Sequence, residues 1–456
     1  MKRKFLMAVL LLAGIITISS YQPEKAPAIV NSYIIKNVKL IDGRGGAVIS
    51  RTDIFVQNGK IAAIGPDQIK KGAVVFEMGG KTVMPALITT HAHIGTLKGL
   101  SNNAVNYTRE NILAQLQKYQ DYGVSNLLIM GSDRPMLFEK GFRDSSQKGL
   151  IPGAIIHSAG YGFGVPQGAP PVGFGFDVIY RPAKPEQVAS EMDSLVKIKP
   201  DVVKLWLDDF GGQFKKMDPA IYKEIIVQAH KRGLRVAAHV YYLGDARRLL
   251  KDGVDIFAHS IRDSVIDDAM IREMKSRHII YIPTLSLDEY AYIYARKPDW
   301  IDDQFFKASL EPGVYNLISS DKYQSDIKNA LNYVKSVRAF ETALKNLKKL
   351  FDAGILISMG TDSGAQPVRA QGFSEHLELE LMVQAGLAPL QAITIGTKNA
   401  SQLLKIDRDY GTIEPGKRAD FVILNADPST DIKNTRKIYA VYKNGKQVSA
   451  GPLAGR

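Results

Sequence analysis

Hydrophobic residues in the middle of the chain, residues 84–406, fall into short apolar runs separated by longer segments. Runs of this length are typical of buried strands, and the spacing of Val188, Met192 and Leu195 is typical of an amphipathic helix. Eight strands alternating with helices favour a (β/α)8 barrel over an open, doubly wound sheet. The predicted strands span residues 87–91, 124–130, 154–157, 202–207, 235–239, 255–258, 279–283 and 355–360.

The two ends of the chain have a different pattern, in which apolar and polar residues alternate as they do in antiparallel strands. Asn58-Gly59 separates two such runs near the start, and Asn444-Gly445 does the same near the end. Asn-Gly is a strong hairpin signal. We therefore expect an α/β protein in which a small composite β-sandwich, from residues 28–84 and 406–456, accompanies a barrel of residues 85–405.

Residues 1–20 have the pattern of a secretory signal peptide, with basic residues at positions 2–4, an apolar run over 5–18 and small residues at 19–20. A permanent anchor is the alternative, but the apolar run is shorter than the roughly 20 residues that a spanning helix needs. The chain contains no Cys, which excludes a lipid anchor on cysteine, disulfides and thiol catalysis. We expect export to a bacterial periplasm, with no stable membrane anchor after cleavage.

The formal net charge of +13 is scattered along the chain. A scattered excess of Lys and Arg is typical of a solvated surface and not of a nucleic-acid interface. The sequence also has neither a Gly-rich nucleotide motif nor a G-x-S-x-G nucleophile elbow, which argues against a dinucleotide enzyme and a serine hydrolase. The expected partner is a small-molecule substrate.

Candidate metal ligands lie on five of the predicted strands. His91 and His93 are two residues apart, so their imidazoles point to the same side of a strand. The other candidates interrupt, end or follow apolar runs, and they are Lys204, His239, His259 and Asp362. Because the carboxyl ends of barrel strands converge on one face, we expect all six to meet there. Each alone could be structural, but together they favour a metal centre.

The motifs around these residues resemble those of the amidohydrolase superfamily, and in particular its imidazolonepropionase-like and prolidase-like group. The matching segments are MPALITTHAH, PDVVKLW, GLRVAAHV, GVDIFAHS, GTDSG and GTIEPGKRADFVIL, in the family's order. The resemblance implies a metal-dependent hydrolase built from a barrel and a composite β-sandwich. It also implies a homo-oligomer, since relatives commonly form one.

By this resemblance, the chain binds two divalent metal ions. His91 and His93 bind the more buried ion together with Asp362, and His239 and His259 bind the second. The donor atoms are nitrogen and oxygen, which suits zinc, with manganese, cobalt or iron as alternatives.

The same resemblance implies that Lys204 bridges both ions as an N-carboxylated lysine and that a metal-bridging hydroxide attacks the substrate. Asp362 would act first as general base and then as general acid toward the leaving nitrogen. Tyr161, Tyr241, Tyr242 and His376 are further candidates for substrate contacts, with packing as their alternative role. The remaining histidines of the middle region, His157, His230 and His278, are interpreted as structural.

The expected reaction is hydrolysis of a carbon–nitrogen bond in an amide, dipeptide-like or N-acyl compound. The same site could serve a cyclic amidase, a heterocycle deaminase, or a lactone or organophosphate hydrolase. A non-catalytic, metal-dependent binding protein is the alternative of another class. Substrate choice should depend on two long connections, residues 160–185 and 285–334, which could be pocket walls or loops packed on themselves.

Overall fold

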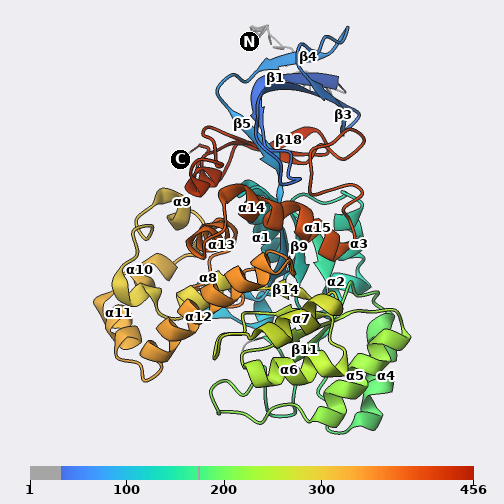
Figure 1. Ribbon diagram of the computed structural model, residues 1–456, viewed down its shortest axis with the longest axis vertical. Helices are drawn as coiled ribbons and strands as arrows, with labels where there is room; N and C mark the ends of the chain where they lie inside the picture. Colours follow the sequence, from blue (N-terminus) through green and yellow to red (C-terminus); the bar gives the residue numbers. More distant parts are fainter. Residues whose placement is uncertain (1–31, 173–174, 456) are drawn as a thin grey trace, which may run out of the picture.

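The computed structural model describes residues 32–172 and 175–455 (Figure 1). The predicted signal peptide, residues 1–20, lies outside the described residues. A sheet built from both ends of the chain forms the top of the molecule in Figure 1, and parallel strands surrounded by helices form the larger part below it. Among the described residues, no helix combines the length and the apolar character that crossing a membrane requires.

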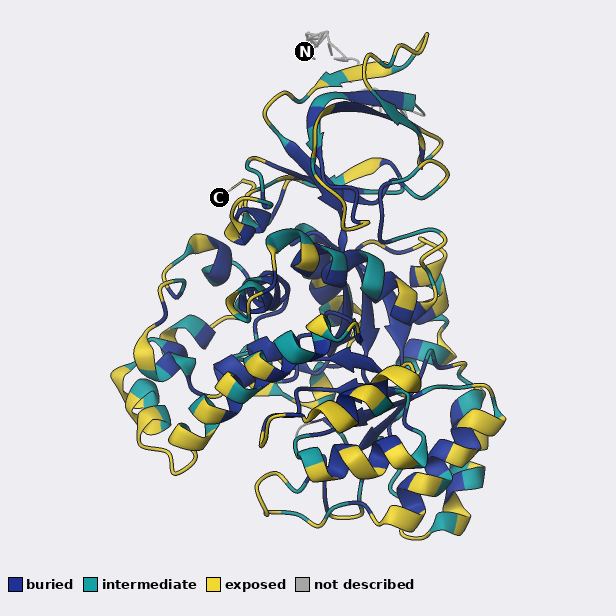
Figure 2. Ribbon diagram, viewed as in Figure 1, coloured by how far each residue is buried: buried dark blue, intermediate teal, exposed yellow. Residues whose placement is uncertain are grey.

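All eight strands predicted for the middle of the chain are present, and neighbouring strands run parallel. They form a three-stranded sheet in the order β10-β9-β6 and a five-stranded sheet in the order β11 to β15. Nearly all of their residues are buried (Figure 2), which explains the continuous apolar runs. The strands are β6 (Leu87–Ala92), β9 (Val124–Ile129), β10 (Ile155–Ser158), β11 (Val203–Trp206), β12 (Val236–His239), β13 (Ile256–Ala258), β14 (Ile280–Ile282) and β15 (Leu356–Ile357).

Hydrogen bonds link these two sheets at both of their outer edges. On one side the Thr90 amide donates to the Met359 carbonyl over 2.7 Å. On the other side the Asp201 amide donates to the Ser158 carbonyl over 2.8 Å. The pairing among the described strands is therefore two parallel sheets joined by isolated bonds, and not one continuous eight-stranded ladder.

Helices surround the parallel strands, and the longer ones bury one apolar face. In α12 (Tyr333–Asp352), for example, Phe340, Ala343, Leu347 and Leu350 are buried at helical spacing, and Figure 2 shows the opposite faces of such helices exposed. The others are α1 (Arg109–Asp121), α2 (Pro135–Glu139), α3 (Phe142–Gln147), α4 (Val188–Val196), α5 (Pro219–Lys231), α6 (Leu243–Asp252), α7 (Asp268–Ser276), α8 (Leu285–Tyr290), α9 (Gln304–Lys307), α10 (Val314–Ile318), α11 (Asp321–Lys328), α13 (Phe373–Gln384), α14 (Pro389–Thr394) and α15 (Ala400–Leu404).

The two ends of the chain pair with each other, as predicted, but in a different arrangement. They form one mixed sheet in the order β18-β17-β16-β5-β1-β2-β3, with β4 beside β1. This sheet curves around a small apolar core of its own, so a single curved sheet replaces the two facing sheets of the expected sandwich. Its strands are β1 (Ser32–Leu40), β2 (Ile49–Gln57), β3 (Lys60–Gly65), β4 (Val74–Glu77), β5 (Thr82–Pro85), β16 (Phe421–Leu424), β17 (Ile438–Lys443) and β18 (Lys446–Ser449).

Candidate metal centre

The strand ends bring His91, His93 and Asp362 into one buried cluster. The Nε2 atoms of His91 and His93 lie 3.2 and 2.9 Å from Oδ1 of Asp362. The ligating atoms of the three residues lie within 4.8 Å of one another, close enough to hold one cation. Asp362 reaches this place because its amide donates to the His91 carbonyl over 2.9 Å, which ties the segment after β15 to the end of β6.

Two glycines allow the strands around this cluster to approach. A Cβ atom at Gly360 would lie 2.6 Å from Cβ of His91, and one at Gly131 would lie 2.8 Å from Cγ of Lys204. Gly131 also has a φ of +87°, which side chains disfavour. Both ligand positions therefore depend on glycine in a neighbouring segment.

His239 and His259 extend the cluster along the strand ends. Their ring centroids are 4.3 Å apart, and the His259 ring lies 4.4 Å from that of His91. Burial lowers the pKa of His91 to about 3 and also lowers the pKa values of His239 and His259. The three imidazoles are therefore neutral at pH 7, which is the form that binds metals.

Lys204 points into the same cluster from β11 and is completely buried. Among the described residues its Nζ atom has no hydrogen-bond partner. Burial lowers the pKa of this amine to about 7, although the Asp362 carboxylate opposes the shift. An unpaired buried ammonium is costly, whereas a neutral amine can be carboxylated and then offer two oxygens to cations. The donor set of four imidazoles, a carboxylate and this lysine therefore fits a pair of divalent metal ions.

One ring nitrogen in each of three histidines has a partner that was not predicted from the sequence. His93 Nδ1 lies 2.6 Å from Ser132 Oγ, and His259 Nδ1 lies 2.9 Å from Thr284 Oγ1. His239 uses Nε2 instead, which lies 2.8 Å from Oδ2 of Asp208. Such contacts fix ring orientation, and they leave Nε2 of His93 and His259 and Nδ1 of His239 for metals. Ser132, Asp208 and Thr284 are polar residues that follow strand ends, but nothing in the sequence pairs each of them with its histidine.

Asp362 has a left-handed backbone with φ +57°, an uncommon conformation for a non-glycine residue that clusters at functional sites. Its second oxygen, Oδ2, pairs with the Arg369 guanidinium. Burial alone would raise the pKa of this carboxyl group, but Arg369 and the two histidines outweigh burial and hold it well below its usual range. Arg369 was not predicted, because it lies seven positions after Asp362 in irregular chain.

The tyrosine candidates lie in two places. The guanidinium of Arg262, which lies three residues after His259, is 4.5 Å from the centroid of the Tyr241 ring. The hydroxyl of neighbouring Tyr242 donates to the Asp209 carboxylate over 2.8 Å. Tyr161 packs between Phe138 and Tyr180, with ring centroids 5.8 Å from each. Tyr241 and Tyr242 thus lie beside the strand ends that carry His239 and His259, and Tyr161 belongs to an aromatic cluster.

His376 has a structural role, which corrects its interpretation as a substrate contact. It is buried on α13, where Nε2 donates to the Tyr122 carbonyl over 2.9 Å and Nδ1 lies 3.0 Å from the Thr435 hydroxyl oxygen. Thr435 belongs to the 3-10 turn η6 (Ile432–Arg436) that leads back to the terminal sheet. Both ring nitrogens are therefore engaged, and the side chain links three segments.

The two long connections differ in what they contact. In residues 160–185, Phe176 packs edge-on against His93 and Trp206, with ring centroids 6.0 and 5.6 Å away. This connection therefore lines one side of the metal cluster. Residues 285–334 instead form four short helices, α8 to α11. Aromatic residues of this second segment, such as Trp300 and Phe306, pack against Phe373 of α13.

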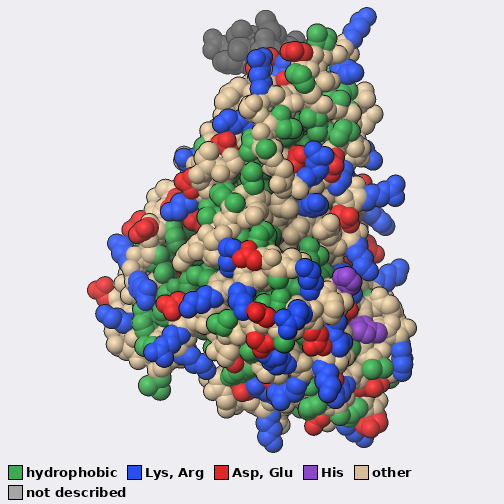
Figure 3. Space-filling model, viewed as in Figure 1, with side chains coloured by type: hydrophobic (Ala, Val, Ile, Leu, Met, Phe, Trp, Pro, Cys, Tyr) green, Lys and Arg blue, Asp and Glu red, His purple; other side chains and the backbone are tan. Residues whose placement is uncertain are grey.

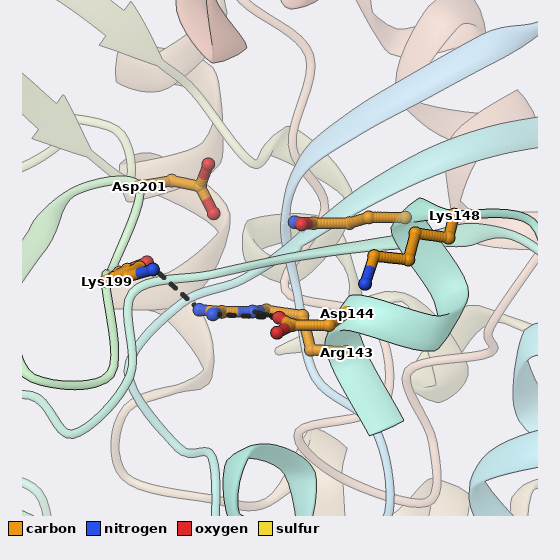
Figure 4. A pocket seen from close by; sticks show the side chains of 6 residues that line it. Arg143, Asp144, Lys148, Lys199 and Asp201 are labelled. Atoms are coloured by element: carbon orange, nitrogen blue, oxygen red, sulfur yellow. Dashed lines mark hydrogen bonds and ion pairs between the residues drawn. The ribbon is translucent and has the colours of Figure 1, made fainter. Parts of the chain in front are cut away.

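A cavity of about 370 Å³ lies at the opposite, amino-terminal side of the strands (Figure 4). Asp201 precedes β11 there, accepts from the Ser158 amide and contacts His157, consistent with the structural role predicted for that histidine. This face of a parallel-stranded fold usually serves stability. The lining residues are Arg143, Asp144, Gln147, Lys148, Lys199 and Asp201.

Comparisons with known proteins agree with this geometry. The model of the amidohydrolase family matches residues 82–448. An imidazolonepropionase of Deinococcus deserti is 40% identical over 91 residues, which are 19% of this chain and 22% of that enzyme. A 5-methylthioadenosine/S-adenosylhomocysteine deaminase of Caldanaerobacter subterraneus is 24% identical over 415 residues, covering 86% of this chain and 84% of that enzyme.

Among solved structures, a Xaa-Pro dipeptidase with bound methionine in its active site has a TM-score of 0.72 and 22% identity. The similarity covers 91% of this chain and 99% of the dipeptidase. At this level of identity the likeness concerns the fold.

Proposed function

Because this chain belongs to the amidohydrolase family and is a hydrolase of that class, which acts on carbon–nitrogen bonds, we propose that it cleaves an amide bond in a small dipeptide-like or N-acyl compound. The observation that carries this proposal is the buried Lys204, whose unpaired Nζ faces a cluster of four histidines and Asp362. A structural lysine would have a partner. A lysine that becomes a carboxylated metal bridge needs none until the metals bind.

The residues divide into two half-sites. His91, His93 and Asp362 would hold one ion, and His239 and His259 the other, with carboxylated Lys204 between them. Zinc suits these donors best. Two divalent ions in this place would supply Lewis acidity that polarises the scissile carbonyl and lowers the pKa of water.

The protein groups around the half-sites would move the protons and exclude solvent. Asp362 accepts a proton from the attacking water and delivers it to the leaving nitrogen. Arg369 holds Oδ2 of that carboxylate and so orients it. Phe176 and Trp206 cover the His93 side, which keeps bulk water from the reacting groups.

We further propose that the two parallel sheets function as one closed (β/α)8 barrel. The bonds from Thr90 to Met359 and from Asp201 to Ser158 support closure on both sides. In such a barrel the catalytic face lies at the carboxyl ends of the strands. Five of the candidate ligands are near or beyond such ends, and Lys204 lies within β11.

A second candidate function is deamination of a heterocycle or opening of a cyclic amide. The similarity to a deaminase over 86% of the chain supports this second function, and the same metal chemistry would catalyse either reaction. Lactone or organophosphate hydrolysis and metal-dependent binding without turnover have no such specific support. A substrate screen that contains dipeptides, N-acyl amino acids, cyclic amides and aminated heterocycles separates these functions.

Export to the periplasm after removal of residues 1–20 also remains part of the proposal, as do a small-molecule partner and a homo-oligomer. On the face shown in Figure 3, Lys and Arg side chains are interspersed with Asp and Glu, which supports a solvated basic surface rather than a nucleic-acid binding site.

The proposal is tested by elemental analysis of protein prepared without chelators and with bicarbonate. About two equivalents of a divalent transition metal per chain are expected. Lys204→Ala should lose metal and activity together, whereas Asp362→Asn should mainly lose rate, by about 10²- to 10⁴-fold. Lys443→Ala, which removes a partly buried lysine of the terminal sheet, is the control. Full metal content and normal turnover in Lys204→Ala would contradict the bridging role.

A further inference from the structure

His239 differs from the other candidate ligands in the group that holds it. Its Nε2 atom lies 2.8 Å from the Asp208 carboxylate, and both side chains are buried. We propose that Asp208 is a positioning residue that fixes His239 for the second metal ion and strengthens it as a donor. This inference rests on the proposed two-metal function.

Asp208 is itself held in place by the turn that follows β11. Its other oxygen, Oδ1, accepts from the amides of Asp209 and Phe210 over 2.7 and 3.1 Å. Such a turn, closed by an Asp side chain, fixes the carboxylate without help from distant residues. Asp208 therefore presents Oδ2 to His239 in one orientation.

The same turn also contacts the face of the His239 ring. Phe210 has a left-handed backbone with φ +50°, and its ring is nearly parallel to that of His239, at 5.9 Å between centroids and an angle of 22°. His239 is thus held at its edge by a carboxylate and at its face by an aromatic ring. With Nε2 engaged, Nδ1 is the nitrogen left for the metal.

The outer contacts of the other histidines are weaker. His93 and His259 meet neutral hydroxyl groups, and His91 Nδ1 has no partner among the described residues. A carboxylate that accepts a histidine N–H increases the electron density on the opposite nitrogen and makes it a stronger metal ligand. Asp208 should therefore favour binding at the His239 and His259 half-site in particular.

The neighbouring Asp209 offers a matched control. It lies in the same turn, but its carboxylate accepts from the Tyr242 hydroxyl over 2.8 Å and lies 3.6 Å from the Lys216 ammonium. Asp209→Ala therefore removes an equal charge from the same turn without removing the contact to His239.

The experiment measures zinc affinity by competition with a chromophoric chelator for wild type, Asp208→Ala, Asp208→Asn and Asp209→Ala. In Asp208→Ala we expect one of the two ions to bind about 10- to 100-fold more weakly. Asp208→Asn keeps the shape of the side chain and removes its charge, so it should weaken the binding of the same ion by less. If Asp208→Ala does not fold, Asp208→Asn is the variant that tests the proposal. Cobalt-substituted Asp208→Asn should also show an altered visible spectrum, because the geometry of one ion changes.

Wild-type affinities for both ions in the Asp208 variants, or an equal loss in Asp209→Ala, would overturn the assignment of Asp208. A wild-type protein that binds no pair of metal ions would instead overturn the proposed function. The two failures are therefore distinguishable in one set of titrations.

Discussion

Buried His376 makes the stability of this protein sensitive to acid in a way that can be predicted. Burial lowers its pKa to about 3, and the charge of Arg436 also disfavours protonation. In the unfolded chain the same imidazole has a pKa of about 6.5. Between these two values the unfolded state binds a proton that the native state does not bind. The stability that neutral His376 contributes is thus complete above pH 6.5 and is lost as the pH falls toward 3.

The size of the effect follows from linkage. Each pH unit below 6.5 costs about 1.4 kcal/mol in the free energy of unfolding, so this residue alone should cost about 2 kcal/mol at pH 5. Replacing the residue as His376→Gln destabilises the protein at every pH, because the contacts to Tyr122 and Thr435 change. It should nevertheless remove about 2 kcal/mol of the difference in stability between pH 7.5 and pH 5.

The assay is urea unfolding of wild type and His376→Gln at both pH values, followed by circular dichroism. Exposed His278→Gln is the control for the exchange of a histidine for glutamine outside the core. Because His91, His239 and His259 also resist protonation, only the difference between variant and wild type reports on His376. A difference near zero would refute the reasoning, and would mean that His376 keeps its proton in the native state with both N–H groups donating.

Two further predictions concern the walls of the metal cluster. Gly360→Ala places a methyl group 2.6 Å from Cβ of His91, so it should cost about 1–3 kcal/mol of stability and reduce metal content. Thermal melting and elemental analysis check these two effects. Gly244→Ala is the control, because its added methyl group has no neighbour within 4 Å. Arg181 donates to the carbonyls of Val165, Gly168, Pro170 and Phe176, so Arg181→Met should expose residues 160–185 to limited proteolysis. Equal cleavage rates in Arg181→Met and wild type would show that the connection has other anchors.

The strands and the cluster of candidate ligands were predictable from the sequence for the same reason. A polar residue that ends an apolar run is conspicuous, and parallel strands carry such residues to one face. His239 and His259 are each recognisable in this way, and Lys204 is recognisable because it interrupts an apolar run. The terminal strands were recognisable from alternation, but alternation cannot tell one curved sheet from two facing ones.

The supporting residues were not predictable, because their positions depend on loop conformation. Asp208 contacts His239 only because the turn after β11 adopts one shape, with Phe210 left-handed. Phe176 reaches His93 from the middle of a long connection that Arg181 holds in place. Local sequence patterns do not show which loop residues contact the candidate ligands.

Helix α13 shows how a residue that was not predicted supports a candidate ligand that was. Its Glu375 is fully buried and accepts from the hydroxyls of Thr361 and Ser363 over 2.7 and 2.8 Å. These are the residues on either side of Asp362, whose left-handed backbone would otherwise be disfavoured. A carboxylate buried on a helix looks like an error in the hydrophobic pattern, yet here it holds the turn that carries the proposed general base. Buried Glu375 is therefore part of the structure that orients Asp362.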